Sequence, residues 1–191
     1  MKKQVLFIQG AGAGAYDEDE KLVESLRSAL GDVYEVLYPQ MPDESDPDYE
    51  SWKGQIKKEL AGLEGEVILI GHSLGGSFLL KYLAEEKVER TVVGIFLIAT
   101  PYWGGDGWQY EGYEQITLPE GFASKLPRGA PIFLFHSRDD EIVPFAHLAL
   151  YAEKLPQATV REFDGCGHQF NNDLSEVAED IKGLSARIFP I

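Results

Sequence analysis

A serine between two glycines is the part of this sequence that most clearly points to chemistry. The segment Gly71–Gly75 reads G-H-S-L-G, follows the apolar run Val67–Ile70 and precedes a helix-like stretch at Ser77–Glu86. In a strand–turn–helix setting this G-x-S-x-G pattern holds a serine hydroxyl at the rim of a sheet, and the glycines leave room for the sharp turn. The context, more than the short motif, predicts that Ser73 is a nucleophile.

A serine hydroxyl needs a base to take its proton and an acid to orient that base. In this architecture the chain order is serine, then acid, then histidine. His168 follows the last predicted strand, at the same rim as Ser73, and is therefore the predicted base. The other histidines are less well placed, within the turn, ahead of the acids or within a predicted helix: His72, His136 and His147.

The acid is expected just after the predicted strand Ile132–His136. Asp140 is preferred because it stands three residues ahead of Val143, a spacing typical of such a loop, and Asp139 is the alternative. One helix and one strand separate Asp140 from His168, which returns the chain to the same rim. His168 would then remove the Ser73 proton while Asp140 orients His168.

A tetrahedral intermediate also needs donors for its oxyanion. The backbone N–H of Leu74, directly after the serine, is the first expected donor. The second is expected from the small-residue loop Gln9–Ala15, with Ala11 preferred and Gly12 as the alternative.

The same loop allows a second interpretation, because Gly10–Ala15 fits the dinucleotide-binding pattern G-x-G-x-x-G/A. The run Asp17–Glu20 follows at once, and four carboxylates would repel a pyrophosphate. The second predicted strand also leads into Leu37–Gln40, without an acidic residue to hold a ribose. The sequence therefore disfavours dinucleotide binding.

Short apolar runs alternate with helical patterns along the whole chain. The predicted strands are Val5–Gln9, Tyr34–Tyr38, Val67–Ile70, Val92–Ala99, Ile132–His136 and Val160–Phe163. The predicted helices are Lys21–Leu30, Tyr49–Leu63, Ser77–Glu86, Phe145–Leu155 and Leu174–Phe189. This alternation predicts a mostly parallel six-stranded α/β sheet with helices on both faces. Residues 1–191 are expected to form one domain with a small insertion at about 101–118.

The insertion is rich in glycine and aromatic residues and leaves the carboxyl end of a predicted strand, where ligands bind in such sheets. We expect Tyr102, Trp103 and Trp108 to form an apolar wall of a substrate pocket. The alternative is a long loop whose rings, with Tyr110 and Tyr113, pack on one another for stability.

Composition narrows the class of protein. The net charge of −15 disfavours nucleic acid and anionic membrane surfaces. The one cysteine, Cys166, excludes an intramolecular disulfide, favours a reducing compartment and is expected to be a small packed residue. Because no apolar run could span a bilayer and the N-terminal run is too short for a signal peptide, we expect a cytosolic protein. No zinc-like spacing is present, so no metal is expected, and the oligomeric state stays open.

Taken together, these stretches resemble the α/β-hydrolase superfamily, and within it the retinoblastoma-binding protein 9 and YdeN-like group of small serine hydrolases. The resemblance is carried by Gly71–Gly76, Asp139–Pro144, Gly165–His168 and the aromatic insertion. It implies a compact α/β/α sandwich without a large cap domain and without a cofactor.

By the pattern of that family, Ser73 is the nucleophile, Asp140 the acid and His168 the base. The first loop lacks the His-Gly pair often found there. The expected function is hydrolysis of small esters, thioesters or amides through an acyl-enzyme, with esters preferred. The competing hypothesis is an idle hydrolase scaffold that acts as a binding module.

Overall fold

Six parallel strands form one sheet in the computed structural model, which describes residues 2–105, 108–109 and 113–187. The order across the sheet is β2-β1-β3-β4-β5-β6. The strands are β1 (Lys3–Ile8), β2 (Tyr34–Leu37), β3 (Glu66–His72), β4 (Thr91–Ile98), β5 (Ile132–Ser137) and β6 (Thr159–Phe163). The chain reverses its direction of winding between β1 and β3, which is where a crevice forms at the carboxyl ends of such sheets.

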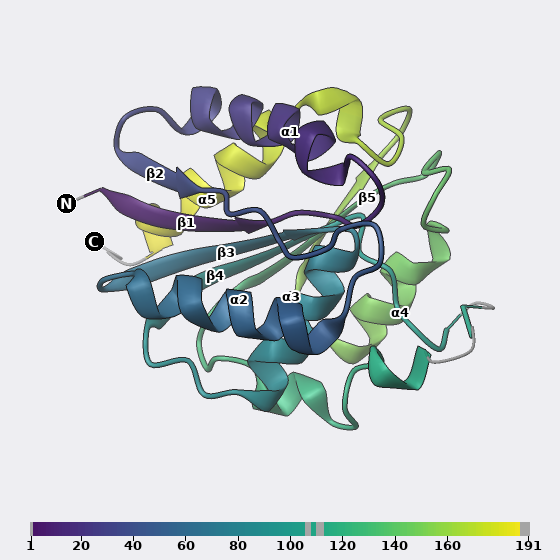
Figure 1. Cartoon of the computed structure of the whole chain (residues 1–191). Helices are drawn as coiled ribbons and strands as arrows, with labels where there is room; N and C mark the ends of the chain where they lie inside the picture. Colours follow the sequence, from purple (N-terminus) through teal and green to yellow (C-terminus); the bar gives the residue numbers. More distant parts are fainter. Residues whose placement is uncertain (1, 106–107, 110–112, 188–191) are drawn as a thin grey trace.

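Five α-helices cover the two faces of the sheet (Figure 1). They are α1 (Ala15–Leu30), α2 (Tyr49–Gly62), α3 (Leu74–Glu85), α4 (Ala146–Lys154) and α5 (Ser175–Arg187). Helices α1 and α5 pack on one face, and α2, α3 and α4 pack on the other. Three short 3-10 turns complete the described elements: η1 (Tyr113–Gln115), η2 (Phe122–Lys125) and η3 (Phe170–Asn172).

The central strands are buried on both faces, as their continuous apolar runs predict. In β1, Leu6 and Ile8 join the core beneath α2 and α3, whereas Val5 and Phe7 join the core beneath α1 and α5. Alternating side chains therefore divide between two cores. The edge strand β6 differs, because its central residues are exposed and Val160 is 37% exposed.

The six-stranded parallel sheet of the sequence prediction is confirmed, and each strand begins and ends within two residues of its predicted bounds. Two helices begin earlier than predicted: α1 at Ala15 instead of Lys21, and α3 at Leu74 instead of Ser77. The acidic run is therefore helical. Asp17 and Glu18 lie in the first turn of α1, where carboxylates stabilise the positive end of a helix.

The aromatic insertion leaves the carboxyl end of β4 as predicted, and Tyr110 lies outside the described residues. Across the described ranges, no helix is both long and apolar enough to span a bilayer.

Candidate active site

Ser73 occupies the sharp turn between β3 and α3. Its backbone has φ 51° and ψ −128°, a positive-φ conformation that costs a non-glycine residue roughly 1–3 kcal/mol. The Ser73 N–H donates to the carbonyl of Ile98 at the end of β4, at 2.8 Å, which holds the turn against the sheet. Ser73 itself is half-buried. The sequence predicted this strained turn.

The glycines around Ser73 are required by close backbone approach. A Cβ on Gly75 would lie 2.1 Å from the carbonyl oxygen of Gln9, and one on Gly71 would lie 2.4 Å from the Cα of Gly76. No side chain fits at such distances. The turn is therefore pressed directly against the end of β1, which brings the Gly-rich loop beside the serine.

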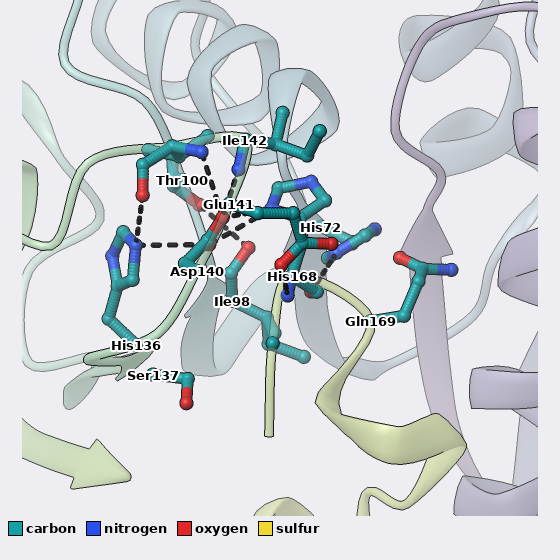
Figure 2. A network of polar contacts seen from close by, with 12 residues as sticks. His72, Ile98, Thr100, His136, Ser137, Asp140, Glu141, Ile142, His168 and Gln169 are labelled. Carbon is teal, nitrogen blue, oxygen red and sulfur yellow. Dashed lines mark hydrogen bonds and ion pairs between the residues drawn. The ribbon is translucent and has the colours of Figure 1, made fainter. Parts of the chain in front are cut away.

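Asp140 and His168 meet at this rim (Figure 2). The ring Nδ1 of His168 lies 3.0 and 2.9 Å from the two oxygens of the Asp140 carboxylate. Asp140 also accepts hydrogen bonds from the backbone N–H groups of Ile142 and Val143, at 2.9 and 2.8 Å. Its side chain is sealed from solvent, whereas that of His168 is 11% exposed.

Burial alone would raise the pKa of the Asp140 carboxyl, but hydrogen bonds from two histidine rings and the backbone hold that pKa well below its ordinary value. Asp140 is therefore ionised at neutral pH. An ionised carboxylate only accepts, so the Nδ1 of His168 carries the proton and its Nε2 is available as a base.

The alternative acid, Asp139, has another partner. Its carboxylate accepts hydrogen bonds from the Ser137 hydroxyl and from the backbone N–H of Gly167, the latter at 3.1 Å. These bonds lower the pKa of Asp139. The next acid, Glu141, accepts from the backbone N–H of His168 at 3.1 Å. Asp139 and Glu141 thus hold the backbone of the loop, and Asp140 holds the imidazole.

His136 is a site residue that the sequence reasoning passed over. It is buried, and its Nε2 lies 3.1 Å from an Asp140 oxygen and 3.0 Å from the carbonyl oxygen of Val143. Both neighbours are acceptors, so Nε2 carries a proton. The Asp140 carboxylate therefore accepts hydrogen bonds from two histidine rings, those of His136 and His168 (Figure 2). A histidine four residues ahead of the acid was the available signal.

His72, expected to be less well placed than His168 because it lies within the serine turn, has other partners for its ring. Its Nδ1 lies 2.9 Å from the Asp19 carboxylate and its Nε2 lies 3.2 Å from the carbonyl oxygen of His168. The two rings of His72 and His168 are 4.9 Å apart. Since His72 precedes Ser73 in the chain, these contacts place the loop of His168 directly beside the serine turn.

The carboxylate of Glu44 holds the Gly-rich loop in place by hydrogen bonds. Glu44 accepts hydrogen bonds from the N–H groups of Gly14 and Tyr16, at 2.9 and 2.7 Å, and from the Gln9 amide at 2.7 Å. Its carboxylate thus fills the place at the start of α1 where a phosphate would bind in a dinucleotide fold. The acidic run already disfavours that interpretation, and in the structure the N–H groups of Gly12, Gly14 and Tyr16 are bonded to Glu44.

The two predicted oxyanion donors come from the start of α3 and from the loop after β1. The N–H of Gly12 donates to the carbonyl of Glu44 at 2.7 Å, so the alternative donor is occupied. The N–H of Ala11 has no hydrogen-bond partner in the described part of the chain. Leu74 is the first residue of α3, where a backbone N–H has no acceptor within its own helix.

The aromatic segment packs partly on itself. The rings of Trp103 and Trp108 are 4.9 Å apart, and Trp108 contacts the His147 ring at 5.0 Å. Tyr102 contacts Tyr151 of α4 at 5.0 Å. The insertion therefore also contributes to stability, as its alternative interpretation held. The three predicted pocket residues are each half-buried, and their role toward a substrate stays a prediction.

Cys166 lies two residues ahead of His168, half-buried, and its N–H donates to the Ser137 hydroxyl at 3.1 Å. Burial and nearby carboxylates raise the pKa of its thiol. A protonated thiol is a weak nucleophile, which agrees with the predicted packing role.

Comparison with known proteins agrees with this geometry. A family model described as serine hydrolase matches residues 25–174. No curated protein matches the chain in sequence. Among solved structures, the ydeN gene product from Bacillus subtilis superposes with a TM-score of 0.72 at 20% identity, over 97% of this chain and 100% of that one.

Two further solved structures are also similar. The esterase domain of a Rhodothermus marinus protein has a TM-score of 0.69 at 20% identity, over 97% of this chain and 87% of that chain. Est1E from Butyrivibrio proteoclasticus has a TM-score of 0.71 at 16% identity, over 97% of this chain and 88% of that chain. At these identities the likeness establishes a shared fold, that of the α/β-hydrolases.

Proposed function

Because the chain belongs to the serine hydrolase family, we propose that it cleaves small carboxylic esters through an acyl-enzyme formed on Ser73. The observation that carries the proposal is the Asp140–His168 contact of 2.9 Å beside the strained serine turn. In this proposal Ser73 is the nucleophile, His168 the general base and Asp140 the acid that orients it.

The reaction follows from the protonation states. Nε2 of His168 takes the hydroxyl proton as the Ser73 oxygen attacks the ester carbonyl. The oxyanion that forms accepts hydrogen bonds from the N–H groups of Leu74 and Ala11. His168 returns its proton to the departing alcohol, and the acyl group stays on Ser73. Water, activated by the same histidine, then releases the acid.

The substrate proposed is a small, uncharged or weakly charged ester with an apolar acyl or aryl group. Tyr102, Trp103 and Trp108 would provide the apolar wall, and the net charge of −15 disfavours strongly anionic molecules. A structure of Est1E with ferulic acid bound shows that an α/β-hydrolase of this shape accommodates an aromatic acid. Thioesters and amides are the less favoured substrates.

The proposed reaction uses no metal or organic cofactor, because Ser73, His168 and backbone donors supply every proton transfer and charge contact. We also propose that the protein acts in the cytosol, as one domain with a small insertion at 101–118, without nucleic acid or membrane partners.

The test is release of nitrophenol from p-nitrophenyl acetate and butyrate. Ser73→Ala should lower kcat/KM by roughly 10³-fold or more, as removal of such a nucleophile does elsewhere. The matched control is Ser124→Ala, an exposed serine in η2, which should retain wild-type activity. Equal, slow release by wild type and Ser73→Ala would refute the proposal and favour the binding-module hypothesis.

A further inference from the structure

The imidazole of His72 is enclosed on all sides, and each of its nitrogens faces an acceptor. Its side chain and that of Asp19 are both only 2% exposed. Nδ1 lies 2.9 Å from the Asp19 carboxylate, and Nε2 lies 3.2 Å from the backbone carbonyl of His168 (Figure 2 shows His72 beside His168). No ring nitrogen is left for proton transfer with a substrate.

This arrangement defines a protonation state. A neutral imidazole has one N–H and one lone pair, so it would direct the lone pair at one of these two acceptors. Only the imidazolium donates to both. Burial lowers the pKa of His72, but the Asp19 charge and hydrogen bond more than offset this, and the pKa is raised overall.

Asp19 connects the other parts of the site. One carboxylate oxygen accepts from His72 and from the backbone N–H of Gly10, the latter at 2.7 Å. The second oxygen accepts from the Gln169 amide at 3.0 Å. Every one of these partners is a donor, as an ionised carboxylate requires. Asp19 on α1 is thus bonded to the loop after β1, the serine turn and the residue that follows His168.

We propose that Asp19 and His72 form a buried ion pair that positions the general base and the oxyanion loop relative to Ser73. This role rests on the proposed function. The pair touches no reacting atom: it acts through the His168 carbonyl and the Gly10 N–H, and both residues are positioning residues.

The physical reason is that His168, in the loop after β6, must stay within reach of Ser73, which follows β3, although β4 and β5 separate these two strands in the sheet. Asp140 fixes its ring, and His72 fixes its backbone from the opposite side. Since His72 directly precedes Ser73, the bond from its ring to the His168 carbonyl sets the separation of base and nucleophile. The Asp19 bond to Gly10 likewise fixes Ala11, the next residue. A displacement of about 1 Å in such a site lowers rates by roughly 10²-fold.

The charged and titratable groups that face the pair come from several elements. Asp19 lies on α1, His168 follows β6, and Asp140 in the loop after β5 adds a further negative charge toward His72. Tyr38, after β2, faces Asp19; burial and that carboxylate raise the pKa of its phenol, so it stays neutral. His72 is therefore surrounded by acceptors and negative charge, which favour its cationic form.

The first test reads the ring directly and without substrate. In ¹⁵N-labelled wild-type protein at pH 7.5, both ring nitrogens of His72, assigned through its backbone, should show the shifts of an imidazolium. In Asp19→Asn that pattern should be lost. A neutral His72 ring in the wild type, or an imidazolium that persists in Asp19→Asn, would overturn the proposal.

The second test is kinetic. Asp19→Asn should lower kcat for p-nitrophenyl acetate by about 10- to 100-fold with little change in KM, because the substrate still binds but the base is misplaced. The matched control is Asp17→Asn, an exposed acid in the same turn of α1, which should retain wild-type kcat. A kcat for Asp19→Asn equal to that of Asp17→Asn would overturn the positioning role.

The two proposals fail separately. A wild-type protein without esterase activity but with a cationic His72 would refute the proposed function and keep the ion pair. An active enzyme with a neutral His72 would do the reverse. If Asp19→Asn does not fold, two measurements still test the ion pair and its positioning role. One is the set of His72 ring shifts in the wild type, and the other is the kcat of Gln169→Ala, which removes one donor to Asp19. Gln169→Ala should then lower kcat by a few-fold, and an unchanged kcat would count against the proposal.

Discussion

Two of the histidine–carboxylate pairs among the described residues lie side by side, and they differ in the group that contacts the second ring nitrogen. In both pairs Nδ1 lies 2.9 Å from a carboxylate oxygen, in His168–Asp140 and in His72–Asp19. The Nε2 of His72 is occupied by a backbone carbonyl, whereas within the described residues no hydrogen bond is made to the Nε2 of His168.

Exposure follows the same division, since the His168 side chain is 11% exposed and that of His72 only 2%. A histidine–aspartate contact is therefore not by itself evidence of a catalytic base. A histidine whose Nε2 has no hydrogen-bond partner can act as a base. A histidine whose Nε2 already donates to a carbonyl, as in His72, can only hold neighbouring groups in place.

The largest expected loss of activity is at His168, and it should exceed the loss at His72. His168→Ala removes the proposed base and should lower kcat/KM by roughly 10³-fold or more while the protein stays folded. His72→Asn should lower kcat less and the melting temperature more, because it opens a buried ion pair. Esterase assays paired with thermal unfolding measure both. A larger loss of activity in His72→Asn than in His168→Ala would contradict the assignment of His168 as the base and His72 as a positioning residue.

The adjacent acids give the next largest contrast. Asp140→Asn should lower kcat/KM by on the order of 10³-fold, because an amide no longer stabilises the cationic form of His168. Asp139→Asn should lower kcat/KM by less than about tenfold, since Asp139 bonds to the Gly167 backbone and the Ser137 hydroxyl and not to the His168 ring. The reverse order in the same assay would make Asp139 the acid.

The support pair should leave a signature in the pH dependence of stability. The pKa of His72 is raised by folding, so its contribution is complete below the unfolded value of about 6.5 and is lost as pH rises through the folded pKa. The pKa of Asp19 is lowered despite burial, so its contribution is complete above its unfolded value and is lost as pH falls through the folded pKa.

Urea unfolding of wild type and Asp19→Asn between pH 5 and pH 10 measures this difference. The wild type should be more stable by about 3 kcal/mol near neutrality, and the gap should narrow toward alkaline pH. A gap that stays constant over the whole range would show that no titrating pair is present.

The smallest effect is expected at His136, the second histidine on Asp140. His136→Gln keeps a donor in place and should lower kcat about twofold, whereas His136→Ala leaves part of the buried carboxylate unsatisfied and should lower it about tenfold. Steady-state kinetics of both variants measure the ratio. Equal activities would mean that His136 does not support Asp140.

The parts of this site that follow from topology could be predicted from the sequence. Parallel strands place their carboxyl ends at one rim, so the order of elements predicts that Ser73, Asp140 and His168 lie there, and the structure shows the contact between Asp140 and His168. The strained turn followed from glycine spacing. These features depend on periodicity and local sterics, which a single sequence displays.

The support pair could not be found in this way. Asp19 and His72 are 53 residues apart, and their contact depends on α1 beginning at Ala15 rather than Lys21. The first turn of α1 carries a run of acids with little apolar pattern, so the run suggested repulsion instead of a helix end. Glu44 was missed for a related reason, because the loop between β2 and α2 has no periodicity to mark an inward side chain.

Covalent labelling with a fluorophosphonate, with the adduct located by peptide mass spectrometry, tests whether Ser73 is the nucleophile. One adduct is expected, on Ser73, which is lost in Ser73→Ala and forms much more slowly in His168→Ala. A folded wild-type protein that stays unlabelled, or that carries the adduct on another residue, would contradict it.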